Sequence, residues 1–233
     1  MTMHKVRVVA VDVGSVARLN DSRFGWVARD CRFDGGSVEH IDKVGCGRRP
    51  DELPEIIDSA LRDGGLVALG MECPLLLPVP ADWRDLGRAR VGDASHAWSA
   101  SAGACSMATG LVQLAWLLHE VARRGGEMGA TTRPDRWCTA APLLLWEAFV
   151  SGTAKTDRSS RGHIADAGAA VQAFLMRIDR LTVADADDVH LGGHRGLNLA
   201  AVAALHAGLC IPRDELDAPL PVVCATATPP SAS

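Results

Sequence analysis

VRVVAVDV, residues 6–13, is a near-continuous run of apolar and mainly β-branched side chains, typical of a strand buried on both faces of a sheet. Residues 24–31 and 37–44 follow as two further strand-like segments, and RFDGG at residues 32–36 is typical of a tight turn between them. Three consecutive strands with such links predict an antiparallel meander at the start of the fold.

The period of the apolar residues changes after the meander. Helical spacing predicts helices over residues 50–62, 106–124, 165–178 and 197–207, and short apolar runs predict buried strands over residues 66–71, 142–146 and 220–224. An ordinary doubly wound fold would alternate strand and helix from its first strand, which this chain does not. We therefore expect an α/β fold in which one mixed sheet carries helices on its faces.

The composition is that of one compact domain. The chain has 233 residues, of which 48% are apolar and 22% charged, and this is enough to bury one sizeable core. We expect a single domain over residues 1–224 and a disordered tail at residues 225–233. Residues 78–105 are long for a structureless loop, so an inserted helical turn or lid is expected there.

Cysteine usage and the N-terminus indicate a cytoplasmic protein. The seven cysteines form an odd set without a CxxC pair, which argues against a zinc site or a disulfide framework. Residues 1–14 lack the apolar core of a signal peptide, and no apolar run approaches the roughly 20 residues of a membrane span. The net charge of −4 means that any contact with nucleic acid would need a local basic patch.

Three carboxylates stand at or near the ends of predicted buried strands. Asp12 lies inside an apolar strand, Glu72 follows residues 66–71, and Glu147 follows residues 142–146. Parallel strands end at the same edge of a sheet, so the three side chains are expected to cluster. Such a cluster suits hard cations such as Mg²⁺ or Mn²⁺, which two-metal phosphodiester hydrolysis requires. The alternative is structural, since each acid could instead bond turn amides, cap a helix or form a salt bridge.

A basic loop follows the last of these strands. Residues 151–163 contain Lys155, Arg158 and Arg161, and together with Ser15 after the first strand they could contact a phosphate backbone. The loop could equally be ordinary solvated surface.

Four short motifs follow one another along the chain: VVAVDVGS at 8–15, GWVA at 25–28, ALGMECPLLLP at 68–78 and LLLWEAF at 143–149. In this order and spacing they resemble the predicted nucleases of the ribonuclease H-like superfamily, and more distantly the RuvC-type resolvases. The resemblance implies a ribonuclease H-like mixed sheet and a nuclease that hydrolyses phosphodiester bonds of DNA or RNA with Mg²⁺ or Mn²⁺. Asp12, Glu72 and Glu147 would be the catalytic and metal-binding residues. The strand form of the nucleic acid and a homo-oligomeric state stay open.

One position departs from that family pattern. Such proteins usually carry Asp or Asp-x-x-Asp at the start of the last helix, where this chain has Asn198, with His194 or Asp188 as substitutes. His194 and Asn198 are therefore expected to complete the metal site. The alternative is a degenerate, non-catalytic module that binds nucleic acid or a protein partner. Gly14-Ser15 also fits the phosphate turn of actin-like ATPases, but those enzymes need two such domains.

Overall fold

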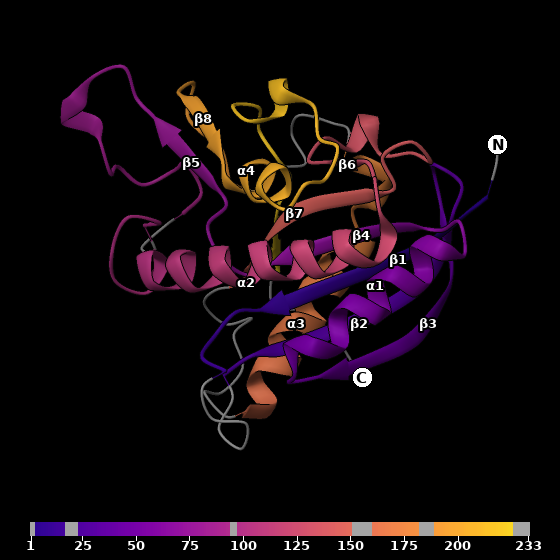
Figure 1. Ribbon diagram of the computed structural model, residues 1–233. Helices are drawn as coiled ribbons and strands as arrows, with labels where there is room; N and C mark the ends of the chain where they lie inside the picture. Colours follow the sequence, from indigo (N-terminus) through magenta and orange to yellow (C-terminus); the bar gives the residue numbers. More distant parts are fainter. Residues whose placement is uncertain (1–2, 17–22, 94–96, 151–159, 182–188, 226–233) are drawn as a thin grey trace.

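The computed structural model describes residues 3–16, 23–93, 97–150, 160–181 and 189–225 (Figure 1). Its strands are β1 (His4–Asp12), β2 (Gly25–Phe33), β3 (Val38–Gly47), β4 (Leu66–Met71), β5 (Leu76–Val79), β6 (Ala130–Thr131), β7 (Leu143–Val150), β8 (Arg195–Asn198) and β9 (Val222–Ala225). Its α-helices are α1 (Leu53–Arg62), α2 (Ser101–Gly125), α3 (Ser160–Leu175) and α4 (Leu199–His206).

Seven strands form one mixed sheet in the order β3-β2-β1-β4-β7-β6, and β9 also pairs with β7. β1, β2 and β3 are antiparallel, whereas β4, β7, β6 and β9 run parallel to β1. β6 pairs with the first half of β7 and β9 with its second half. The predicted α/β fold, a mixed sheet of ribonuclease H-like order with helices on its faces, is confirmed.

The two faces of the sheet carry different helices, because successive side chains of a strand point to opposite sides. Val9 and Val11 of β1 face the core shared with α1, α2 and α4, whereas Val8 and Ala10 face the core under α3. In Figure 1, α1 and α2 lie in front of the sheet and α3 lies behind it. A residue that shifts by one position along a strand therefore changes both its face and its helix neighbours.

Helix α2 is long and apolar enough to cross a membrane, by length and composition alone. Its apolar stretch is nevertheless interrupted by Gln113, His119 and Glu120, so it is not a continuous apolar run of about 20 residues. The helix packs with one side into the core, through Leu114, Leu117, Leu118 and Val121, as a helix of a globular α/β domain does. A single such helix is weak support for a membrane span.

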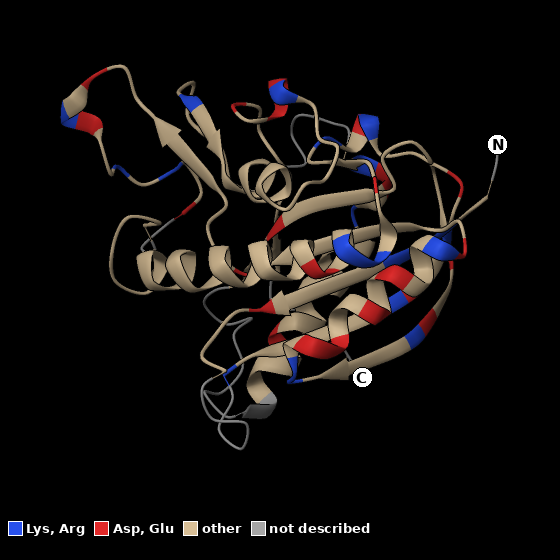
Figure 2. Cartoon of the chain, in the orientation of Figure 1, with Lys and Arg blue, Asp and Glu red and all other residues tan. Residues whose placement is uncertain are grey.

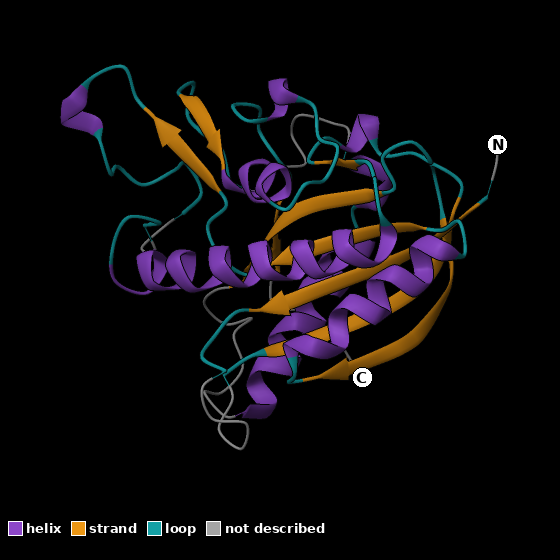
Figure 3. Cartoon of the chain, in the orientation of Figure 1, coloured by secondary structure: helices purple, strands orange, loops and turns teal. Residues whose placement is uncertain are grey.

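β5 and β8 form a separate two-stranded antiparallel sheet, which stands away from the main sheet (Figure 3). Between β5 and α2 lies a helical turn, Trp83–Asp85, within the predicted insertion at residues 78–105. Of the predicted tail, Ala225 belongs to β9 and residues 226–233 lie outside the described residues. The single-domain assignment stays a prediction.

Candidate metal centre

Asp12 and Glu72 are neighbours at the carboxyl ends of β1 and β4. The parallel register pairs Val11 with Met71, and the amide of Glu72 continues this ladder by donating to the carbonyl of Val11 at 2.8 Å. Since the register places Asp12 level with Glu72, both side chains point to the same face of the sheet, the face covered by α3. The expectation that these two acids come together therefore holds.

The third member of the cluster is Asp166, on α3. One ligand atom from each of Asp12, Glu72 and Asp166 lies within 4.8 Å of the other two. Asp12 is 4% exposed and Asp166 is 2% exposed, while Glu72 is half-buried. Burying two carboxylates against a third is costly unless a cation or hydrogen-bond donors stabilise them. These three acids are called the carboxylate cluster below.

His163 adjoins the carboxylate cluster from the same helix. Its Nδ1 atom lies 2.5 Å from Oδ2 of Asp12. His163 and Asp166 are three residues apart, so they share one face of α3. That face continues into the core through Ala167, Ala170, Val171 and Phe174, all of which are buried. The packing of α3 on the sheet thus carries both polar side chains to the end of β1.

The structure places Glu147 away from the carboxylate cluster, which corrects the prediction. β7 does not end at residue 146 but continues to Val150 along β9, so Glu147 lies inside the strand. Its register partner on β4 is Met71, one residue short of Glu72. An offset of one residue sends a side chain to the opposite face, and Glu147 therefore faces away from α3.

On that face Glu147 belongs to a buried ionic network with Arg90 and Asp93. Arg90 donates to both oxygens of Glu147 at 2.8 Å and to Asp93 at 2.8 Å. The amides of Leu75 and Leu76 also donate to Glu147, at 2.7 and 3.2 Å. Burial alone would lower the pKa of Arg90, but the two acids raise it above its ordinary value. Glu147 therefore fastens the segment after Glu72 to the sheet.

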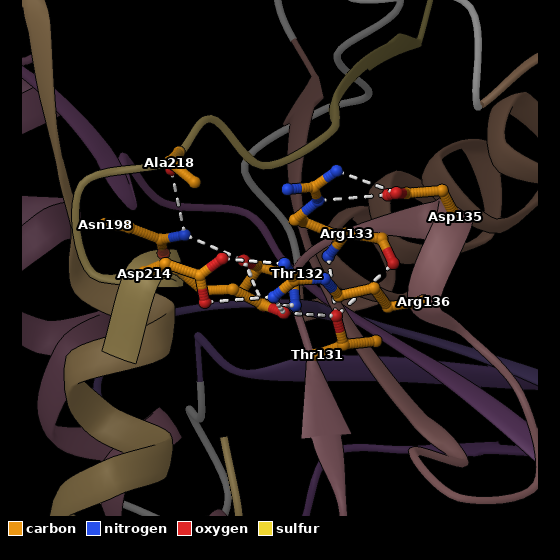
Figure 4. Close-up of polar contacts among 9 residues, drawn as sticks. Thr131, Thr132, Arg133, Asp135, Arg136, Asn198, Asp214 and Ala218 are labelled. Atoms are coloured by element: carbon orange, nitrogen blue, oxygen red, sulfur yellow. Dashed lines mark hydrogen bonds and ion pairs between the residues drawn. The ribbon is translucent and has the colours of Figure 1, made fainter. Parts of the chain in front are cut away.

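Asn198 is a helix cap, and its assignment as a metal ligand is likewise corrected. Its Oδ1 atom accepts from the amide of Ala201 in the first turn of α4. Its Nδ2 atom donates to Oγ1 of Thr132 at 2.9 Å and to the carbonyl of Ala218 at 3.2 Å (Figure 4). His194 lies half-buried before β8 and is not among the described acids and histidines that gather with Asp12.

The predicted phosphate-binding residues are only partly described. Ser15 is exposed in the loop after β1, and its carbonyl accepts from the amide of Arg23 at 2.9 Å. Lys155 and Arg158 lie outside the described residues. Arg161 lies in the first turn of α3. Among the described residues, basic and acidic side chains are interspersed rather than gathered by sign (Figure 2).

Asp166 and His163 were not predicted from the sequence, because the last acid was expected at the helix over residues 197–207 and not on α3. α4 follows β8, which pairs with β5 outside the main sheet, whereas α3 packs directly on β1 and β2. A signal was available in the sequence. His163-x-x-Asp166 has the same spacing as the Asp-x-x-Asp that was expected at the last helix, with His in the first position, and it stands at the start of a helix predicted over residues 165–178.

The carboxylate cluster is a set of oxygen ligands of the kind that divalent cations such as Mg²⁺ and Mn²⁺ prefer. It is also the only group of three or more acids, histidines or cysteines with this ligand spacing in the described part of the chain. The three acids come from a strand end, a residue beyond a strand end and a helix, so the folded sheet is needed to assemble them. A buried site able to hold a divalent cation is therefore present at this edge of the sheet.

No family model, curated protein or solved structure matches the chain.

Proposed function

We propose that this protein is a divalent-metal-dependent nuclease of the ribonuclease H-like superfamily, hydrolysing phosphodiester bonds of nucleic acid. The observation that carries the proposal is the carboxylate cluster, because Asp12, Glu72 and Asp166 bring three ligand atoms within 4.8 Å of one another. The mixed sheet supports it, since the meander followed by strand–helix alternation is the ribonuclease H-like order. Glu147, Asn198 and His194 have no part in the proposed site.

The residues present fit Mg²⁺ or Mn²⁺. Asp12, Glu72 and Asp166 would hold the cation through hard oxygen ligands, and their negative charges would offset its positive charge. A bound cation would activate water and polarise the phosphate that it contacts. The negative cluster would itself repel a phosphodiester, so the protein would bind its substrate productively only when the cation is present.

His163 would hold Asp12 in place. Its Nδ1 contact with Asp12 at 2.5 Å would fix the orientation of that carboxylate in the site. The imidazole would thus support a ligand rather than serve as one, and the three proposed ligands are all carboxylates. Carboxylates suit both Mg²⁺ and Mn²⁺, so we expect cleavage with either metal.

The test is cleavage of labelled single-stranded, duplex and branched DNA and RNA, with each metal and with EDTA. Wild type should cut at least one of these substrates in a metal-dependent way. Asp12→Asn and Asp166→Asn should each reduce the rate at least about 100-fold, because losing even an outer partner of a metal ligand costs about 10–100-fold. Glu127→Gln is the matched control, since it removes an exposed acid on the turn after α2.

A non-catalytic module is the other outcome of this experiment. This alternative was favoured because Asn198 stands where an acid was expected. It is weakened because Asp166 supplies a third carboxylate from a different helix. If wild type cuts no substrate with either metal but still binds nucleic acid or a protein partner, the nuclease assignment is wrong. If Asp166→Asn cuts as fast as wild type, the carboxylate cluster is not the active site.

A further inference from the structure

The backbone of helix α3 lies directly against Gly25, the first residue of β2. Gly25 is buried and pairs directly with Asp12 across the antiparallel ladder. A Cβ atom at Gly25 would lie 2.5 Å from the carbonyl carbon of His163, 2.6 Å from its oxygen and 2.7 Å from the amide nitrogen of Ile164. All three are backbone atoms, so no change of side-chain rotamer could relieve the overlap.

A side chain at Gly25 would therefore have to move an element. β2 is hydrogen-bonded to β1 along its whole length and to β3 from Trp26 onward, so the strand is held in the sheet on both sides. α3 is held from one face, and its far end is anchored by Phe174, whose ring lies 4.6 Å from that of Trp146. The displacement would fall on the first turn of α3.

We propose that Gly25 is a positioning residue for the carboxylate cluster: by lacking a side chain, it lets the first turn of α3 settle close enough to β1 for His163 to reach Asp12 and for Asp166 to join the cluster. The importance of this positioning for catalysis rests on the proposed function. A displacement of about 1 Å at a reacting site can cost roughly 100-fold in rate, so the contact is close enough to matter.

Gly168 offers a matched control on the same helix. A Cβ atom there would first meet Cγ2 of Val27 at 3.8 Å, which is an ordinary van der Waals contact. Gly168→Ala therefore adds the same methyl group between α3 and β2 without forcing the two apart. Alanine is also the better helix former, so this substitution leaves the helix intact.

The experiment compares wild type, Gly25→Ala and Gly168→Ala by two measurements. Amide hydrogen exchange of residues 164–167, whose N–H groups bond back to the first turn of α3, reports the docking of that turn when it is followed by mass spectrometry without metal. Mn²⁺ titration reports the site, with and without the additional change Asp166→Asn. We expect Gly25→Ala to fold, to exchange these amides at least about 10-fold faster and to bind Mn²⁺ about 10–100-fold more weakly, a loss of the size seen when partners of metal ligands are removed. Gly168→Ala should match wild type in both.

The coupling between the two positions distinguishes positioning from general destabilisation. If Gly25 acts by placing Asp166, Asp166→Asn should weaken Mn²⁺ binding strongly in wild type and in Gly168→Ala, but hardly at all in Gly25→Ala. Unchanged exchange, an undiminished effect of Asp166→Asn or loss of folding in Gly25→Ala would each overturn the inference. If wild type binds no Mn²⁺, the proposed function fails, and hydrogen exchange alone still decides whether Gly25 seats the helix.

Discussion

The role of Asn198 at the end of β8 is set by its hydrogen-bond partners more than by its residue type. Asn198 has the chemistry of a weak metal ligand, yet its amide nitrogen donates to Thr132 and Ala218, and its oxygen caps α4. Thr132 in turn donates its hydroxyl hydrogen to buried Glu215 at 2.9 Å. An amide is required there because one end must donate while the other accepts.

Replacing that amide by a carboxylate should destabilise the protein without improving the metal site. In Asn198→Asp the new oxygen would face the carbonyl of Ala218 and the carboxylate of Glu215 nearby, so the free energy of unfolding should fall by about 1–3 kcal/mol. Urea denaturation measures this change, and Mn²⁺ titration should give the wild-type affinity. Tighter Mn²⁺ binding in Asn198→Asp would mean that the metal site has been located wrongly.

In the native protein, the buried cysteines should react more slowly with a thiol reagent than the exposed cysteines. Burial raises the pKa of Cys31 to about 12 and that of Cys224 to about 11, and burial followed by the nearby acids raises the pKa of Cys73. The thiolate is the reactive form, so these three should stay unreactive at pH 8. The exposed cysteines should react: Cys46, Cys105, Cys138 and Cys210.

The measurement is the number of thiols that react with Ellman's reagent at pH 8, native and then in guanidinium chloride. Four should react quickly in the native protein and seven after unfolding. Raising the pH toward 9 should speed the reaction of the exposed thiols only, because the raised pKa of the buried thiols keeps them protonated. Rapid native labelling of Cys31 or Cys73 would contradict the packing of the sheet.

At the scale of elements, the strands and helices were predictable but the extent of one strand was not. Alternation and apolar runs located every strand of the main sheet except the two-residue β6, because those patterns follow directly from burial on two faces. The sequence predicts that β7 ends at residue 146, since Glu147 interrupts the apolar run. The strand continues because Arg90 neutralises that acid from a loop more than 50 residues away, which no local pattern reveals.

The ionic network around Glu147 should be a sensitive point of the fold. Arg90→Met would leave Glu147 and Asp93 buried without their cation, which should lower the free energy of unfolding by about 3–5 kcal/mol. Arg88→Met is the control, since its ion pair with Asp85 is solvent-exposed and should contribute at most about 1 kcal/mol. Urea denaturation of both variants gives the comparison. Equal losses of unfolding free energy in the two variants would show that the buried network does not hold the loop of Arg90 to the sheet.

Part of the candidate site could be predicted from the sequence and part could not. Asp12 and Glu72 could be predicted because each stands at the end of an apolar strand, and parallel strand ends meet at one edge of a sheet. Asp166 required knowing which helix covers the face onto which those acids point. A shift of one residue in the register between β4 and β7 would decide whether Glu147 or Trp146 points to the face of Asp12 and Glu72. The sequence of neither strand determines that register alone.

At the scale of the whole molecule, the carboxylate cluster exists only in the folded chain. Its three acids are separated by 60 residues between Asp12 and Glu72 and by 94 between Glu72 and Asp166, so the unfolded chain holds no such site. A cation that binds only the native state must stabilise it by mass action. Metal binding can thus be measured through the thermal stability of the whole protein, independently of any substrate.

Wild type should therefore melt at a higher temperature with Mg²⁺ or Mn²⁺ than with EDTA. At a metal concentration about 100 times the dissociation constant the gain is about 2.7 kcal/mol, which for a chain of this size raises the melting temperature by about 5–10 °C. Asp12→Asn and Asp166→Asn should lose most of this shift, because each removes one of three ligands. Glu127→Gln should keep the full shift, since that acid is exposed and lies outside the cluster. Equal melting temperatures of wild type with millimolar metal and with EDTA would remove the basis for a metal site, whereas an equal shift in all four proteins would place the bound ion elsewhere.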